Sequence, residues 1–215
     1  MSFNRSPLRT GIATLVTIFA WTILAVAQEQ AVPSQQQDVA SKIRIKNFGQ
    51  MDQRFYRGGQ PKEQDYKDLA AIGIATVIDL RDDPTEYEKR EVEAAGMRYV
   101  HMPMIAKKYP EQQQVEAFLK LANDPATGKF FVHCAGGRHR TGAMGAVYRF
   151  TNYGWNFDQV YKEMKQYDFY TRFGHGDFKK FVEDYWTRIQ THSASNTPIS
   201  TADASAAATA LHANQ

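Results

Sequence analysis

Short apolar runs alternate with amphipathic stretches through most of this chain. Residues 76–80 are nearly all apolar, as expected for a strand covered on both faces, whereas 43–48 alternate apolar and polar positions as a half-buried strand does. Apolar positions three and four residues apart predict helices, whose ends glycine and proline help to mark. The strands expected are 43–48, 55–57, 76–80, 97–102 and 129–132, and the helices are 62–72, 84–95, 110–122, 141–152, 156–166 and 177–189.

This alternation of strands and helices predicts an α/β fold with a mostly parallel central sheet flanked by helices. In such sheets ligands bind beyond the carboxyl ends of the strands. Residues 133–140 lie at that position, because they connect the apolar strand 129–132 to the helix 141–152. This connection is therefore the first candidate for a functional site.

The two ends of the chain differ from this body. Arg5 and Arg9 precede an apolar run, residues 11–27, which closes with small residues. This order is typical of a secretory signal, so we expect export to a periplasm or the medium, with a retained membrane anchor as the alternative. The expected organisation is a signal or anchor at 1–27, a linker at 28–42, one globular domain at 43–190 and a disordered tail at 191–215.

Composition narrows the classes of function. The chain has 215 residues and a formal charge of +3, of which Arg5 and Arg9 supply two units. The remaining residues are thus nearly neutral, which gives no support for nucleic-acid binding. A single cysteine cannot form an internal disulfide, so the cysteine content indicates no compartment.

The candidate connection contains that only cysteine, Cys134, and an arginine six positions later. A free thiol has a pKa of about 8.5, and nearby cations, backbone N–H groups and helix N-termini all lower it. All three are expected around Cys134, which favours a thiolate nucleophile. Gly136 and Gly137 permit a loop whose amides point to one centre, and such a cradle also fits a phosphate.

Neighbouring side chains complete this chemistry. Arg140 can bind two phosphate oxygens as a fork and stabilise the charge that develops during transfer. Thr141 can donate a hydrogen bond to the sulfur, and we expect His133 to order the loop rather than to act as a base. A zinc site built from His133, Cys134 and His139 is not favoured, because no second cluster supplies the remaining ligands of a closed site.

The loop also resembles a known signature. Residues 133–142 read His-Cys-Ala-Gly-Gly-Arg-His-Arg-Thr-Gly, and match every fixed position of H-C-x-x-G-x-x-R-T-G in cysteine-dependent protein tyrosine and dual-specificity phosphatases. The ending at 138–142 is similar to that of atypical dual-specificity phosphatases of plants and fungi, a group associated with inositol pyrophosphates as well as phosphoproteins. The likeness covers roughly residues 43–187.

This resemblance implies a phosphomonoester hydrolase that acts on a phosphorylated protein or small metabolite through a phosphocysteine on Cys134, without metal or organic cofactor. The catalytic residues that it implies are His133, Cys134, Arg140 and Thr141, and the substrate-binding residues are Ala135, Gly136, Gly137, Arg138 and His139. Four further residues lie in other matching segments, where they either face the pocket or form a structural ion pair: Arg57, Gln60, Asp79 and Arg81.

The general acid is not identified by the sequence. In the better-known members of the family an aspartate on a loop about thirty residues before the cysteine protonates the leaving group, but residues 101–106 contain no carboxylate. Glu111 is expected in the first turn of a helix, and Asp124 in a turn. His139 is a further candidate, because some lipid phosphatases of the superfamily carry an aspartate at its position; its alternative role, with Arg138, is to extend a positive pocket.

Alternatives to a protein phosphatase remain open at this point. An inositol polyphosphate or pyrophosphate phosphatase would use the same residues, and its leaving phosphate, with a second pKa of about 6, needs little protonation. A catalytically weak phosphate-binding module would explain the missing acid. A sulfurtransferase is less favoured because its cysteine loop is usually shorter.

Overall fold

The computed structural model describes Met1 and residues 43–195, with side chains described as far as Thr191. Within this part of the chain, five strands form one sheet in the order β1-β2-β5-β3-β4, and β1 alone runs antiparallel to its neighbour. The mostly parallel sheet of an α/β fold is thereby confirmed. The strands are β1 (Gly49–Gln50), β2 (Phe55–Gly58), β3 (Ile74–Arg81), β4 (Arg98–Met104) and β5 (Lys129–His133).

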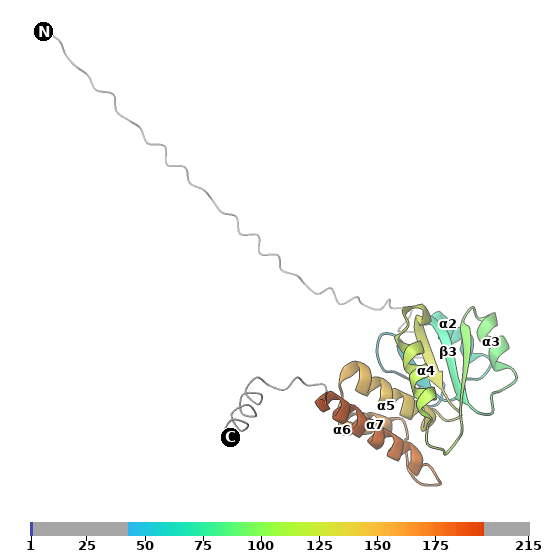
Figure 1. Cartoon of the computed structure of the whole chain (residues 1–215). Coiled ribbons are helices and arrows are strands. Elements are labelled where there is room, and N and C mark those ends of the chain that lie inside the picture. Colours follow the sequence, from blue (N-terminus) through green and yellow to red (C-terminus); the bar gives the residue numbers. More distant parts are fainter. Residues whose placement is uncertain (2–42, 196–215) are drawn as a thin grey trace. The chain divides into compact units, whose positions relative to one another are not determined.

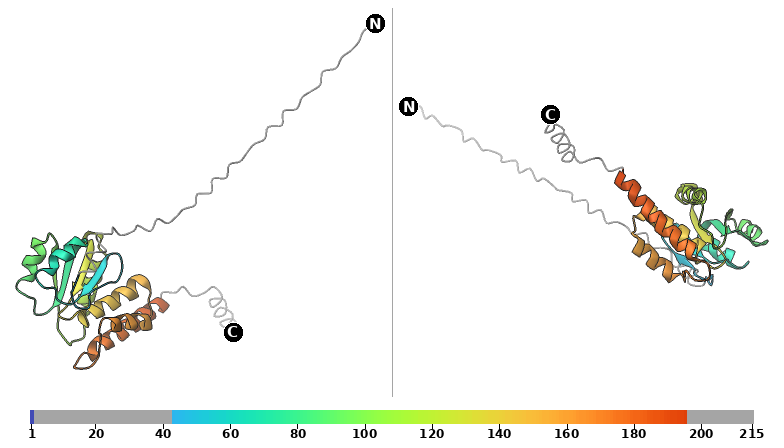
Figure 2. Two further views of the ribbon diagram at one scale, coloured as in Figure 1. Left: turned by 180° about the vertical axis from the view of Figure 1, so that it is seen from behind. Right: turned by 60° about the horizontal axis from the view of Figure 1, so that its bottom comes forward.

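Helices cover both faces of this sheet (Figure 1). One apolar cluster joins the sheet to α4–α7, and a second joins it to α2 and α3. The helices α5, α6 and α7 also contact one another and form one group, which Figure 2 shows from behind. The helices are α2 (Asp65–Ala71), α3 (Glu88–Ala94), α4 (Gln112–Asn123), α5 (Arg140–Tyr153), α6 (Phe157–Gln166) and α7 (Gly176–Ser195), with a 3-10 turn, η1, at Pro125–Thr127.

The strand β5 occupies the middle of the sheet, between β2 and β3. Successive side chains of a strand point to opposite faces, so Phe130 packs in the cluster of α4–α7 and Phe131 in the cluster of α2 and α3. Both rings are completely buried. The residues that follow β5 are therefore held by a strand fixed on both sides and both faces.

The strand predicted at 43–48 is wrong. Its side chains do alternate, since Ile43 and Ile45 are buried while Arg44 and Lys46 are exposed. However, the chain turns at Lys46–Asn47, where Asn47 has a φ of 53°, and the ladder with β2 begins only at Gly49. Alternating burial reports which side chains face a core, and it does not require a neighbouring strand.

Several helix boundaries also differ from the predicted ones. The helix α2 begins at Asp65 rather than at 62, and α3 begins at Glu88 rather than at 84. Pro61 and Pro84 therefore belong to the loops that precede these helices. At the other end, α7 continues to Ser195, so the predicted start of the tail at 191 falls inside a helix.

The remaining predictions about the chain ends lie outside the described residues. These are the signal or anchor at 1–27, the linker at 28–42 and the tail from 196 onward. Among the helices that the structure does describe, none is long and apolar enough to cross a membrane.

Candidate active site

The candidate loop connects β5 to α5 at the carboxyl end of the central strand. The strand β5 ends at His133, and α5 begins at Arg140, one residue earlier than predicted. The N-terminus of α5 thus faces the loop with its partial positive charge. Four small residues in its first turns are buried and let the helix lie close to its neighbours, namely Gly142, Ala143, Gly145 and Ala146.

The thiol of Cys134 is 4% exposed, and its pKa lies below the ordinary value. Burial alone would raise this pKa, because a charged sulfur loses its hydration. The hydroxyl and backbone N–H of Thr141, the positive charge of Arg140 and the backbone of Gly136 together outweigh burial. This lowered pKa lies in the direction that the sequence predicts.

Arg140 presents one edge of its guanidinium to the site. Its three hydrogen bonds all leave from Nη1, to Asp82 Oδ1 at 2.6 Å, to the carbonyl of Met104 at 3.0 Å and to the carbonyl of Leu80 at 3.4 Å. Among the described residues, none accepts a hydrogen bond from Nε or Nη2. These two donors form the planar fork that suits two oxygens of one phosphate.

Residues far away in the sequence hold the loop from outside. The side chain of Asn47 donates to the carbonyl of Gly136 at 2.8 Å, and the side chain of Arg57 donates to the carbonyl of Gly137. The backbone amide of Gln60 donates to the carbonyl of Ala135 at 3.3 Å. Three consecutive carbonyls are thus turned away from the site. The amides of 135–139 donate to no oxygen of the described residues. That of Gly136 interacts with the sulfur of Cys134, and the others are available to an anion.

Glycine is required at Gly137 for two reasons. Its φ is 66°, in the region that side chains disfavour. A Cβ at this position would also lie 2.4 Å from the carbonyl carbon of Gly58. The loop and the end of β2 therefore approach each other through two glycine backbones.

His133 lies behind the nucleophile and is completely buried. Its Nε2 is 2.7 Å from Glu88 Oε1 and 3.8 Å from Asp79 Oδ1. Burial lowers the pKa of an imidazole, but the hydrogen bond and charge of Glu88, with Asp79, raise the pKa of His133 overall. Because Nε2 faces two carboxylates, this placement agrees with an ordering role better than with that of a base.

The same three residues are the one group of the described chain that could hold a metal ion by ligand spacing. Their side chains are completely buried, and Nε2 and Oε1 already lie at hydrogen-bond distance from each other. Gln60 also donates to Glu88 at 2.9 Å, and the hydroxyl of Tyr99 donates to Asp79 at 3.0 Å. A buried ion pair, in which Glu88 Oε1 faces the histidine and Glu88 Oε2 accepts from Gln60, describes this arrangement better than a set of metal ligands.

Of the four residues predicted either to face the pocket or to form an ion pair, three are connected, because Arg81 donates to Gln60 Oε1 and, from its backbone amide, to Asp79 Oδ1, each at 2.8 Å. Arg57 is buried, binds the loop and lies 3.9 Å over the ring of Tyr167. Gln60 and Asp79 belong to the network around His133, and Arg81 pairs with Asp83 at 3.0 Å. The structural alternative is thus favoured, although Asp79 pairs with a histidine rather than with an arginine.

The ring of His139 is directed to the segment 169–178. It stacks on His175 with centroids 3.6 Å apart, and its Nε2 lies 2.9 Å from the carbonyl of Tyr170. Burial, His175 and the nearby arginines, against a smaller opposing effect of Tyr170, lower the pKa of His139 to about 4. A neutral, enclosed imidazole fits neither the predicted acid nor a positive extension of the pocket. Arg138 pairs at 3.4 Å with Asp168, the residue directly before this segment.

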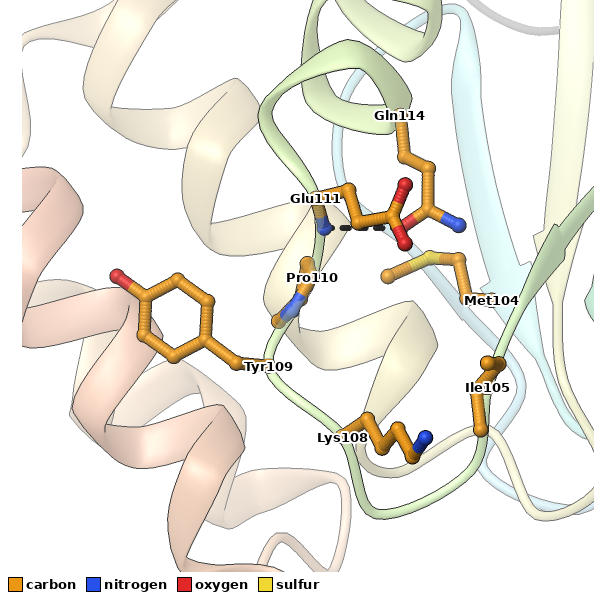
Figure 3. Close-up of a pocket in the computed structure, with 7 residues that line it drawn as sticks. All are labelled: Met104, Ile105, Lys108, Tyr109, Pro110, Glu111 and Gln114. Carbon is orange, nitrogen blue, oxygen red and sulfur yellow. Dashed lines mark hydrogen bonds between the residues drawn. The ribbon is translucent and has the colours of Figure 1, made fainter.

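The other predicted acids occupy structural positions. Glu111 caps α4, where its backbone amide donates to Gln114 at 2.9 Å (Figure 3), and Asp124 caps η1 by accepting from Ala126. A hollow of about 30 Å³, room for one water molecule, adjoins Glu111. Its lining consists of Met104, Ile105, Lys108, Tyr109, Pro110, Glu111 and Gln114.

Sequence reasoning missed three residues of the site, Asn47, Asp82 and Glu88. Asp82 offered a signal, since it follows the apolar strand β3 at the edge where ligands bind. Asn47 lies in a segment that resembles the family, and Glu88 is one of several charged residues of its helix. Nothing in the sequence around Asn47 or Glu88 indicated that they contact Gly136 and His133.

Comparisons with known proteins assign this arrangement to a family. A family model described as "DSP-PTPase phosphatase fused to NAD+ Kinase" matches residues 25–183. The chain belongs to this family. It is therefore a cysteine-dependent phosphatase of the tyrosine and dual-specificity class, as the resemblance of the loop predicted.

Individual relatives agree with the assignment. A probable tyrosine-protein phosphatase of Dictyostelium discoideum is 28% identical over 156 residues, which are 68% of this chain and 90% of that protein. The core catalytic domain of the PP-IP phosphatase Siw14 of S. cerevisiae, solved with citrate, has a TM-score of 0.57 at 16% identity. The match covers 71% of this chain and 96% of the Siw14 chain. P. aeruginosa TpbA in complex with pTyr has a TM-score of 0.55 at 23% identity, and the match covers 63% of this chain and 82% of the TpbA chain. The two solved structures share the fold.

Proposed function

We propose that this phosphatase hydrolyses phosphomonoesters through a phosphocysteine on Cys134, with Arg140 binding the phosphate. The observation that carries the proposal is the arrangement around one sulfur. Groups that lower the pKa of Cys134 lie beside loop amides that donate to no described oxygen and beside the free edge of Arg140. An attacking thiolate and a phosphate dianion both need such a set of donors.

The reaction has two displacements at phosphorus. In the first, the sulfur of Cys134 forms a bond to phosphorus while the bond from phosphorus to the ester oxygen breaks, and the leaving oxygen takes a proton from water or an acid. In the second, water attacks phosphorus, the sulfur leaves as a thiolate stabilised by Thr141, and inorganic phosphate is released with the proton passing to solvent.

The favoured substrate is a phosphorylated protein, in particular phosphotyrosine. A tyrosine leaving group has a pKa of about 10, low enough to leave with modest help from a proton. The similarity to a probable tyrosine-protein phosphatase over 90% of that protein supports this choice.

An inositol polyphosphate or pyrophosphate is the second candidate. The observation in its favour is that two carboxylates considered as the acid have other roles, Glu111 in the cap of α4 and Asp82 in an ion pair with Arg140. A leaving phosphate with a pKa of about 6 needs little protonation. The fold is shared with a PP-IP phosphatase, whereas the predicted export argues against an intracellular metabolite.

Phosphate release by the full chain tests both candidates. The panel contains an aryl phosphate, phosphotyrosine and phosphoserine peptides, and inositol polyphosphates and pyrophosphates, with Cys134→Ser as the control. We expect release that disappears in the control and is greatest for the phosphotyrosine peptide. Release that persists in the control would contradict the cysteine mechanism, and binding of tungstate without any release would indicate a phosphate-binding module.

We also propose that residues 1–27 export the protein, on the sequence pattern of basic residues, apolar run and small residues. Expression of the full chain with separation of cell envelope, periplasm and medium tests this. Cleavage after Ala27, read by mass spectrometry, is expected; an uncleaved chain in the membrane fraction would support the anchor instead.

A further inference from the structure

The phosphate-binding arginine is held by a side chain from another element. Of the three acceptors at Nη1 of Arg140, two are main-chain carbonyls, and the third is the carboxylate of Asp82, at 2.6 Å. The carboxylate bond is the shortest of the three. It is also the one that carries a full charge, so it contributes most to the direction in which the guanidinium plane lies.

The second oxygen of the same carboxylate is also engaged. Asp82 Oδ2 accepts a hydrogen bond from the backbone amide of Ala106 at 3.1 Å. Ala106 belongs to the segment after β4, and the carbonyl of Met104, the last residue of β4, accepts a hydrogen bond from Arg140. One carboxylate therefore links the phosphate-binding arginine to the segment where better-known relatives carry their acid.

The other described carboxylates around the site have different partners. Asp83 pairs with Arg81, Asp168 with Arg138, and Glu88 with His133. Asp82 is thus the one described acid whose ion pair is made with Arg140. Its pKa is lowered, since the amide of Ala106 and Arg140 outweigh the effect of burial, which keeps it a carboxylate at neutral pH.

We propose that Asp82 is a positioning residue for the reaction, which fixes Nη1 of Arg140 so that Nε and Nη2 face the phosphate oxygens. The inference rests on the proposed phosphate-binding role of Arg140. A guanidinium that is oriented before the substrate arrives loses less conformational freedom on binding. Asp82 is not the general acid in this proposal, because both of its oxygens accept hydrogen bonds and its proton is absent.

The test compares Asp82→Ala and Asp82→Asn with Asp83→Asn in the full chain. Asp83 is the neighbouring acid, its side chain is 72% exposed, and its partner is Arg81. The readouts are the dissociation constant of tungstate, a phosphate-like oxyanion, and kcat and KM for two aryl phosphates whose phenols differ in pKa. Thermal unfolding of each variant shows whether the fold is retained.

We expect Asp82→Ala to weaken tungstate binding roughly tenfold, the effect of one charge-assisted hydrogen bond. Asp82→Asn retains an acceptor without the charge and is expected to fall between Asp82→Ala and the wild type. The loss in kcat/KM should be equal for both aryl phosphates, and Asp83→Asn should stay within twofold of the wild type. Values for Asp82→Ala as close to wild type as those of Asp83→Asn would overturn the proposal.

Two further comparisons separate positioning from other roles. A loss confined to the substrate with the poorer leaving group would make Asp82 the acid and would overturn the positioning role. A double-mutant cycle with Arg140→Ala shows whether Asp82 acts through that arginine. In the Arg140→Ala background, Asp82→Ala should no longer change the affinity for tungstate, and an unchanged effect of Asp82→Ala there contradicts the proposal. Tungstate binding needs no turnover, so this result stands even if the cysteine mechanism fails.

Discussion

At the scale of single residues, the reactivity of Cys134 depends on a balance between burial and hydrogen bonding. The sulfur is almost enclosed, which disfavours its charge, and the hydroxyl and amide of Thr141 are the largest effects that oppose this. Donors within the first turn of α5 therefore favour the thiolate. A helix N-terminus serves this purpose because its first amides lack partners of their own.

Removal of the Thr141 hydroxyl should raise the pKa of Cys134. We expect Thr141→Val to shift the pH midpoint of alkylation by iodoacetamide upward by about one unit, the equivalent of about 1.4 kcal/mol. Since Cys134 is the chain's only cysteine, the reaction reports on this thiol alone. Thr141→Ser retains a hydroxyl and should keep the wild-type midpoint; an unshifted midpoint in Thr141→Val would contradict the assignment.

Substitution of Gly137 should destabilise the protein more than its backbone angle alone explains. Gly96 provides the matched control, because its φ of 79° is similar in kind while nothing lies within 4 Å of a Cβ there. We expect Gly96→Ala to lower the free energy of unfolding by about 1 kcal/mol and Gly137→Ala by at least 2 kcal/mol more. Urea unfolding of both variants measures the difference, and equal losses would show that the contact with Gly58 is relaxed.

At the scale of elements, α3 supports the loop through Glu88. The completely buried pair of Glu88 and His133 connects this helix to the end of β5, directly before the nucleophile. A buried ion pair is costly to break, because the remaining charge has no compensation. The helix α3 thus fixes the loop without contributing a group to the reaction.

Glu88→Gln should destabilise the protein in a way that depends on pH. The pKa of His133 is raised in the folded state, so its contribution is fully present below about 6.5 and is lost as the pH rises through the raised value. We expect a loss of about 3 kcal/mol in the free energy of unfolding at pH 6, decreasing toward pH 9.

Urea unfolding at both pH values measures this loss. Glu93→Gln, on the same helix with a side chain that is 56% exposed, is the control and should change stability little at either pH. A loss in Glu88→Gln that grows with pH would contradict a charged His133.

The sequence predicted the kind and order of most elements but not all of their limits. Strands such as 74–81 and helices such as 140–153 have apolar patterns long enough to be recognised. The segment 43–48 has the same alternation without a strand partner, and its place is set instead by contacts such as Asn47 to Gly136. Whether an extended segment joins a sheet depends on neighbours that its own residues do not specify.

At the scale of the whole molecule, two apolar layers hold the central strand in place. Phe130 and Phe131 are adjacent in the chain and completely buried, yet they pack in different clusters. A strand covered on both faces has little freedom to shift along its axis, because a shift of one residue would exchange every side chain between the layers. The position of Cys134 is therefore fixed by the core.

Both aromatic residues of β5 should be important for stability. We expect Phe130→Ala and Phe131→Ala each to lower the free energy of unfolding by about 3–5 kcal/mol. Phe48 is partly buried beside the second cluster, and Phe48→Ala should cost less than either. Urea unfolding measures all three, and a loss below about 1 kcal/mol for Phe130 or Phe131 would contradict two covered faces.

The sequence by itself determined the fold class, the reactive loop and the family resemblance. These features depend on residues that are adjacent or a few positions apart, since the periods of strands and helices and the spacing from Cys134 to Arg140 are local. The tertiary structure decided which distant residues meet the loop, among them Asn47, Asp82 and Glu88. The physical reason is that the order β2-β5-β3 brings separate segments to one edge of the sheet, and no local pattern encodes that order.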